Sequence, residues 1–213
     1  TDVSKLKPKI RFDVDVRGQH TISTEASYDW EKQLWQTKRR PQTVAGLVIY
    51  ARFDGSFAIW DPARALLSEE IDGSGDLFLS SSEVWNGRLS EEQSRRERWI
   101  CNGLTRDWVS WQTGGERYAD KYQALVACLA TLSPSSDTPL TPGDPTRFPL
   151  DSREIPTLKM PYGDVPLELA SAGVQRAVAL AYILVWSWHE HLASSEIIRK
   201  QPQRHLVLLV DEV

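Results

Sequence analysis

The C-terminal quarter of the chain carries the pattern that most restricts its fold. The run from Ala177 to Trp188 is almost entirely apolar, which is typical of a helix buried on most sides. Ser171 is a good N-cap, so we expect this helix from about Ala172 to Ser194. After a polar loop, five aliphatic residues from Leu206 to Val210 predict a strand buried on both faces, as in a parallel sheet. A helix, a loop and a buried strand in this order indicate an α/β fold.

The first part of the chain has the patterns of β structure. Residues Ile10 to Val16 alternate between apolar and polar side chains, which predicts a strand. Two apolar runs, Gly46 to Phe53 and Phe57 to Trp60, are separated by Asp54-Gly55, a strong signal for a hairpin turn. Asp61-Pro62 then has the form of an N-cap followed by proline at the first helical position.

The middle of the chain is more helical. Ser80 with Glu83, and Ser90 with Gln93, have the spacing of a capping box. Arg117 to Leu132 carries an amphipathic stripe, which predicts a helix. From Ser133 to Pro166 lie eight of the 12 prolines, so we expect an extended connector rather than a regular element.

These patterns divide the chain into four predicted parts. They are a β-rich part (1–66), a helical subdomain (67–132), a proline-rich connector (133–166) and a final helix and strand (167–213). The chain starts at Thr1 without a methionine and stops at Val213, directly after a predicted core strand. We interpret both ends as cuts in a longer protein.

Composition favours a cytoplasmic globular protein without a membrane span. Hydrophobic residues make up 41% of the chain and the formal net charge is -4, so general binding to nucleic acid is not indicated. The two cysteines, Cys101 and Cys128, have no metal-like spacing and fit a reducing compartment. The longest apolar run, Ala177 to Trp188, is much shorter than the roughly 20 residues that cross a bilayer.

Two short motifs lie on the predicted C-terminal elements. Asp211-Glu212 follows the predicted strand at its carboxyl end, and parallel sheets bind ligands at the carboxyl ends of their strands. In P-loop enzymes an aspartate at such a position supports magnesium, and a following glutamate can polarise the attacking water. Ser171 and Gly173 open the helix, where free N–H groups and the helix dipole suit a phosphate. Taken singly, each motif also fits a plain structural role: a core strand entering a surface turn, and an N-cap serine with a packing glycine.

Taken together, the two motifs resemble the C-terminal lobe of ABC-type ATPase heads, in the SMC, RecF and OLD-like branch of bacterial AAA-type ATPases. Ala170-Ser171-Ala172-Gly173-Val174 stands where that family has its Leu-Ser-Gly-Gly-Gln signature, and Asp211-Glu212 stands where it has Walker B. Ala170 and Val174 depart from the signature, with Gln175 one place late. The motif-bearing likeness covers about Pro161 to Val213. Further stretches also look like bacterial members of this group: Gly46 to Arg52, Phe57 to Arg64 and Val165 to Ser171.

The resemblance implies a fold and a chemistry for the intact protein. The fold would be an ABC/SMC-like head with an antiparallel β part, a helical part and a parallel-sheet C-terminal lobe. ATP and Mg²⁺ would be bound, with Asp211 supporting the metal and Glu212 acting in catalysis. The signature residues would contact the nucleotide held by a second head of a homodimer; they are Ser171, Ala172, Gly173 and Gln175. DNA maintenance or phage defence is the implied role, with DNA or a nuclease effector as partner.

The P-loop is missing from these 213 residues, because no glycine is followed by lysine. We therefore expect it upstream in the intact protein and expect this chain alone to be inactive. One alternative is a metal-dependent nuclease or phosphohydrolase that uses Asp211 and Glu212. Another is a non-enzymatic interaction domain, with the tryptophans and the proline-rich stretch forming a partner surface.

Other polar groups are interpreted as structural. His189-Glu190-His191 suggests metal binding, but residues two apart on a helix point to nearly opposite faces, so we expect a solvated helix end. Asp13 and Asp15 fit the outer face of a half-buried strand, and Arg95 to Arg98 a solvated helix. Lys38 to Arg40 is a weak DNA-binding hypothesis. We assign Trp108 and Trp111 to helix or core packing.

Overall fold

The structure is a computed structural model that describes residues 8–14, 22–29, 34–37, 46–69, 76–90, 98–135, 137 and 139–211. The chain divides into two compact units, Thr1–Ala45 and Gly46–Val213. The predicted β-rich part, residues 1–66, includes the first unit and the first two strands of the second unit, which pair with other strands of that unit. In the described residues the protein is mixed α/β, with several small sheets and five helices.

The first unit contains an antiparallel three-stranded sheet in the order β1-β2-β3. Its strands are β1 (Lys9–Val14), β2 (Ile22–Asp29) and β3 (Leu34–Thr37). Lys9 and Arg11 on β1 both pair with Glu25 on β2. The strand predicted from Ile10 to Val16 is therefore confirmed as far as Val14. Asp15, Lys38 to Arg40 and the side chain of Asp13 lie outside the described residues.

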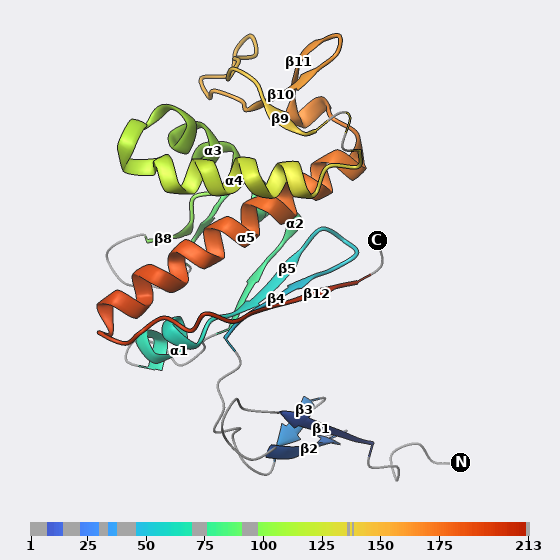
Figure 1. The fold of residues 1–213 in the computed structure, drawn as a ribbon, viewed down its shortest axis with the longest axis vertical. Helices are drawn as coiled ribbons and strands as arrows, with labels where there is room; N and C mark the ends of the chain where they lie inside the picture. The colour runs from blue at the N-terminus through green and yellow to red at the C-terminus, as the bar shows by residue number, and fades with distance from the viewer. Residues whose placement is uncertain are drawn as a thin grey trace. The chain divides into compact units, whose positions relative to one another are not determined.

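The second unit is built on a four-stranded sheet in the order β12-β4-β5-β6 (Figure 1). The strands are β4 (Leu47–Ala51), β5 (Phe57–Trp60), β6 (Asp76–Leu79) and β12 (Leu206–Val210). β12 runs parallel to β4, as predicted, whereas the other two pairs are antiparallel. The predicted hairpin between β4 and β5 is confirmed. Gly55 takes a φ of +79° in its turn, and Asp54 accepts hydrogen bonds from the backbone and hydroxyl of Ser56.

Most helix starts follow the predicted capping signals. The helices are α1 (Pro62–Glu69), α2 (Ser81–Asn86), α3 (Leu104–Thr113), α4 (Ala119–Thr131) and α5 (Ala172–Ile197). Asp61 caps α1 by accepting the Ala63 N–H at 2.9 Å. Ser80 and Glu83 form a complete capping box at α2. The second predicted capping box cannot be followed, because Gln93 lies outside the described residues, as do Arg95 to Glu97.

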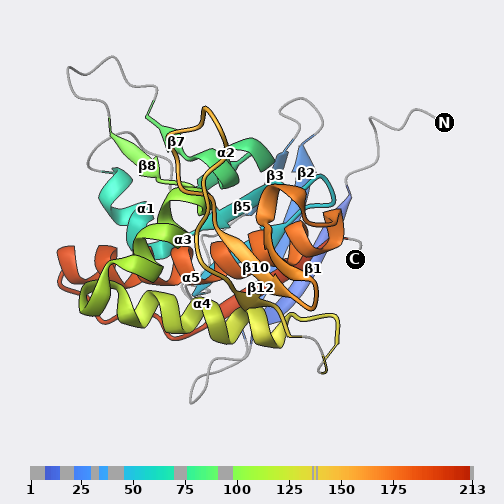
Figure 2. The same ribbon diagram turned by 90° about the horizontal axis from the view of Figure 1, so that it is seen from above.

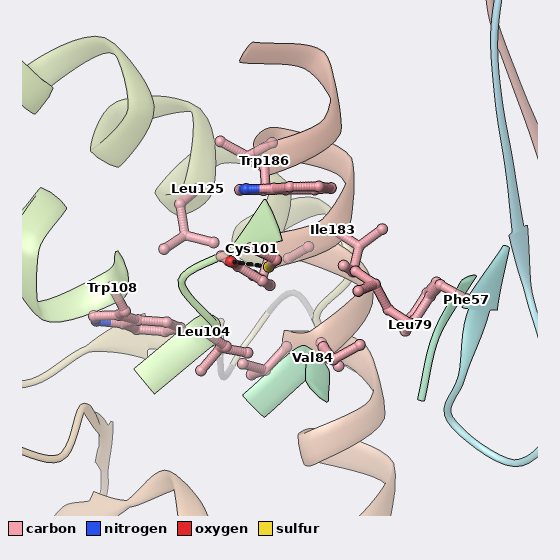
Figure 3. Close-up of a cluster of buried hydrophobic side chains, with 14 of the residues drawn as sticks. Phe57, Leu79, Val84, Cys101, Leu104, Trp108, Leu125, Ile183 and Trp186 are labelled. Carbon is pink, nitrogen blue, oxygen red and sulfur yellow. Dashed lines mark hydrogen bonds between the residues drawn. The ribbon is translucent and has the colours of Figure 1, made fainter. Parts of the chain in front are cut away.

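The long helix α5 forms the centre of the second unit. It packs against β4 on one side and against α4 on another, and Figure 2 shows α4 and α5 running side by side. Figure 3 shows Ile183 and Trp186 of α5 among side chains from the sheet, such as Leu79, and from the helical layer, such as Leu125. Trp108 and Trp111 of α3 are buried in the same cluster, as expected. The prediction of a helix buried on most sides is confirmed.

The prediction that residues 133–166 form an extended connector or surface excursion without regular elements is wrong in part. This stretch contains a three-stranded antiparallel sheet in the order β11-β10-β9. Its strands are β9 (Thr141–Pro142), β10 (Thr157–Met160) and β11 (Gly163–Pro166). A 3₁₀ helix, η3 (Leu167–Leu169), then leads into α5, and a second one, η2 (Gly115–Tyr118), precedes α4. The remaining pair is a short hairpin of β7 (Arg88–Leu89) and β8 (Trp99–Cys101).

The prediction that β12 is buried on both faces is wrong. All five of its residues are exposed, with Leu209 at 51%. β12 is the outermost strand of the four-stranded sheet and packs mainly against β4, so its side chains receive little cover on either face. Within the described part of the chain, no helix is long and apolar enough to cross a membrane.

Candidate functional site

The N-terminus of α5 is open to solvent. Ser171 caps it by accepting the Val174 N–H at 3.4 Å, and Ser171, Ala172 and Gly173 are all exposed. A Cβ added at Gly173 would meet no atom within 4 Å. The backbone N–H groups of this first turn are therefore accessible to a ligand, and the positive end of the helix dipole favours an anion there.

Gln175, a predicted nucleotide-binding residue, bonds to the segment that precedes α5. Its Nε2 donates to the carbonyl oxygens of Leu167 and Glu168, each at 3.1 Å. These two bonds fix η3 against the first turn of α5.

Asp211 follows directly after β12, at the carboxyl end of the strand. Its N–H donates to the Ala51 carbonyl at 2.9 Å, which continues the pairing with β4 by one residue. Its Oδ2 accepts the hydroxyl of Tyr50 at 3.1 Å, and this bond raises the pKa of Tyr50. Glu212, the predicted catalytic residue, lies outside the described residues.

Arg176 joins the helix end to the strand ends. Its guanidinium donates to the carbonyls of Arg52 at 3.1 Å, Phe53 at 3.0 Å and Asp211 at 3.1 Å. Since Arg176 lies in the second turn of α5, these bonds hold the open helix N-terminus beside the ends of β4 and β12. The structure thus brings the two predicted motifs together at one end of the sheet, beside the ends of β4 and β12.

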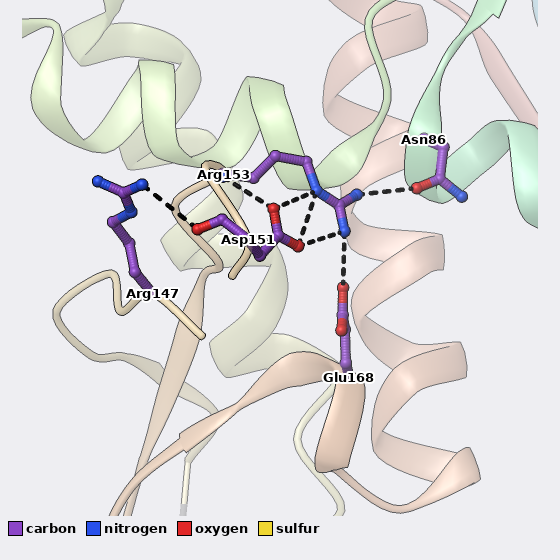
Figure 4. Close-up of polar contacts among 5 residues, drawn as sticks. All are labelled: Asn86, Arg147, Asp151, Arg153 and Glu168. Atoms are coloured by element: carbon purple, nitrogen blue, oxygen red, sulfur yellow. Dashed lines mark hydrogen bonds and ion pairs between the residues drawn. The ribbon is translucent and has the colours of Figure 1, made fainter. Parts of the chain in front are cut away.

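A polar network steadies the segment just before α5 (Figure 4). Arg153 donates to both carboxylate oxygens of Asp151, lies 3.9 Å from Glu168 and donates to Asn86 Oδ1 at 3.4 Å. Arg147 donates to the Asp151 backbone carbonyl at 3.3 Å. The Arg153 guanidinium lowers the pKa of Asp151 to about 2. No local pattern in the sequence indicates this network, because its members come from three separate segments.

The C-terminal third of α5 holds a buried acid–base pair, so the expected solvated helix end is wrong for His191. His191 is 1% exposed, and its Nδ1 lies 2.7 Å from Asp61 Oδ1. Its Nε2 faces the Gln203 N–H at 3.1 Å. Because a backbone N–H can only donate, Nε2 is the acceptor, and the ring proton on Nδ1 is donated to Asp61. The pair ties α5 to the start of α1 and to the loop that leads into β12.

A second buried network lies around Tyr182 of α5. Its hydroxyl donates to Asp107 Oδ2 at 2.9 Å, and Cys101 Sγ lies 3.2 Å from the same hydroxyl oxygen. Asn102 donates to the other Asp107 oxygen at 2.9 Å. Burial raises the pKa of Asp107 and of the Cys101 thiol. A buried thiol with a raised pKa is unreactive, so this cluster is structural.

Among the described residues, no group of three or more histidine, cysteine, aspartate or glutamate side chains could hold a metal ion.

No protein-family model, curated protein or solved structure matches this chain.

Proposed function

We propose that this chain is the signature and Walker B portion of an ABC/SMC-like ATPase head. The observation that carries the proposal is the link through Arg176 between an open helix N-terminus and a carboxylate at the end of a parallel strand. Helix N-termini bind phosphates, and acids at parallel strand ends bind the accompanying magnesium. The resemblance of the two segments to the signature and Walker B motifs supports the same function.

Each residue has a defined task in this proposal. Asp211 supplies an oxygen to Mg²⁺, and Glu212 orients the attacking water. Ser171, Ala172 and Gly173 contact the phosphates of ATP held by a second head, so the active form is a homodimer. Gln175 and Arg176 position these groups by binding backbone carbonyls. The P-loop comes from outside these 213 residues. DNA maintenance or phage defence, with DNA or a nuclease effector as partner, follows from the resemblance alone.

One observation favours a non-enzymatic interaction domain as the alternative. The five aliphatic side chains of β12 are exposed, and exposed apolar strands pair readily with partners. Of the tryptophans predicted to form a partner surface, Trp108, Trp111 and Trp186 are buried, whereas Trp99 is 47% exposed. A nuclease or phosphohydrolase that uses Asp211 would need further metal ligands beside it.

The sharpest test of the ATPase proposal is Gly173→Ala in the complete protein that contains this chain. The new methyl group meets no atom within 4 Å, so the fold should be kept or gain up to about 1 kcal/mol in stability from better helix propensity. The same methyl group lies where a phosphate must approach the backbone. We therefore expect steady-state ATP hydrolysis to fall by about tenfold or more, which corresponds to about 1.4 kcal/mol in the transition state.

A matched pair of capping variants controls for helix stability. Ser171→Ala and Ser80→Ala each remove an N-cap and should each cost about 1 kcal/mol of stability. Only Ser171→Ala should lower ATP hydrolysis, because the Ser80 side chain bonds to Glu83 and to none of the site residues. Unchanged hydrolysis in both Gly173→Ala and Asp211→Asn would overturn the proposal. Metal-dependent hydrolysis of phosphate esters by this chain alone would favour the phosphohydrolase instead.

A further inference from the structure

The hydroxyl group of Ser187, in the middle of α5, lacks a hydrogen-bond partner. Ser187 is 2% exposed, and its Oγ is the one buried side-chain nitrogen or oxygen without a partner in the described residues. A serine or threonine inside a helix usually donates to the carbonyl four residues earlier. Thr113 and Thr131, at the ends of α3 and α4, do so at 2.7 and 2.9 Å. The Ser187 hydroxyl does not make that bond, and a buried hydroxyl without any partner is costly, so a partner from outside the chain would stabilise it.

Ser187 lines a small cavity between α5, the sheet and α1. The other lining residues are Ile59, Asp61, Arg64, Leu77, Trp186 and Glu190. The cavity volume is ≈ 10 Å³, and a site of roughly 10–15 Å³ by this measure holds one water molecule. Such a water needs two to four polar partners, whereas a purely apolar cavity of this size stays dry. This lining is mixed, because it includes the polar side chains of Asp61, Arg64, Ser187 and Glu190.

We infer that the cavity binds one internal water molecule, which bridges the Ser187 hydroxyl and the Glu190 carboxylate. Glu190 lies three residues after Ser187, so the two side chains project from the same face of the helix. Asp61 also lines the cavity, but its Oδ1 already accepts from Ala63 and His191, so it could offer only Oδ2 to the water. A metal ion fits less well than water, since the Arg64 cation also lines the cavity.

The water also explains how Glu190 is accommodated. Burial raises the pKa of this carboxyl group, which reflects the cost of removing its charge from bulk solvent. A bridging water restores part of that hydration. The inferred site does not depend on nucleotide and lies apart from the open end of α5.

The direction in which Ser187→Ala changes the Tm tests whether the cavity holds a water molecule. In a hydrated site, Ser187→Ala removes a satisfied hydroxyl, so we expect the Tm of the full chain to fall by about 2–4 °C. In a dry site, the same change removes a buried hydroxyl without a partner, and the Tm should rise. The control is Ser110→Ala, at a half-buried position within α3. Any serine-to-alanine change in a helix raises the Tm through better helix propensity, and this control measures that gain. The Tm change of Ser187→Ala is compared with the Tm change of Ser110→Ala.

A second measurement covers the case in which Ser187→Ala does not fold. A crystal structure of the unsubstituted chain should show one ordered water within hydrogen-bond distance of Ser187 Oγ and a Glu190 oxygen. A Tm rise in Ser187→Ala, or an empty cavity in that crystal structure, would overturn the inference. Glu190→Gln, which can still bind water, should keep the density.

Discussion

β4 and β12 are neighbouring parallel strands of nearly the same composition, yet one is buried and the other is exposed. They pair residue by residue, from Leu206 opposite Leu47 to Val210 opposite Ala51. In β4, Leu47 and Ile49 are fully buried, whereas every residue of β12 is exposed. The difference comes from their neighbours: β4 lies between β12 and β5 and packs against α5, and β12 pairs only with β4.

An aliphatic run in a sequence therefore indicates that a strand tends to be buried. It does not show whether other elements of the fold cover the side chains of that strand. β12 is held in place by its ends more than by its side chains. His191 binds the Gln203 N–H before the strand, and Arg176 binds the Asp211 carbonyl after it. The position of Asp211 therefore depends on backbone anchors that are distant from it in sequence.

The largest expected effect is a difference in stability between the same kind of substitution in β4 and in β12. Ile49 and Leu208 are register partners, with exposures of 0% and 37%. Ile49→Ala should lower the free energy of unfolding by about 2–5 kcal/mol, because it leaves a cavity in the core. Leu208→Ala should cost about 1 kcal/mol or less, since little buried area is lost. Urea denaturation of both variants provides the measurement, and equal losses would contradict the exposed position of β12.

A smaller effect is expected where the two strands begin. A Cβ at Gly46 would lie 1.8 Å from the His205 carbonyl oxygen, so Gly46→Ala must push apart the segments that enter β4 and β12. Such overpacking should cost about 1–3 kcal/mol in the free energy of unfolding. Gly173→Ala, which meets no atom, is the matched control and should not destabilise the protein. If Gly46→Ala were equally silent, the close approach of the strands would be wrong.

The sequence predicted those parts of the fold that depend on local chemistry. Asp54-Gly55 specifies its hairpin through an Asx bond and a positive φ, and Asp61, Ser80 and Ser171 each cap the helix that follows. The three-stranded sheet in the proline-rich stretch was missed because its prolines stand where a strand tolerates them. Pro142 and Pro166 end their strands, and Pro161 lies in the turn between β10 and β11.

The candidate site was predictable only as two separate motifs. Ser171, Gly173 and Asp211 stand out by type and position, but their approach depends on Arg176 reaching across to Arg52 and Phe53, more than 100 residues earlier. The burial of His191 likewise depends on Asp61, 130 positions away. Long-range contacts of this kind leave no periodic trace in a single sequence.

The smallest expected effect concerns the bond between the ends of the two strands. Tyr50→Phe keeps the ring of β4 but removes the hydroxyl that donates to Asp211, so the Tm should fall by no more than about 2 °C. The pKa of Tyr50 is raised in the folded protein, so the stabilisation is complete below the unfolded value of about 10 and is lost as the pH rises through the folded pKa. Thermal melts from pH 8 to 11 should therefore show the gap between the two proteins closing at high pH. A gap that stays constant over this range would mean that Tyr50 does not bond to Asp211 in solution, and would remove one of the contacts that fix the end of β12.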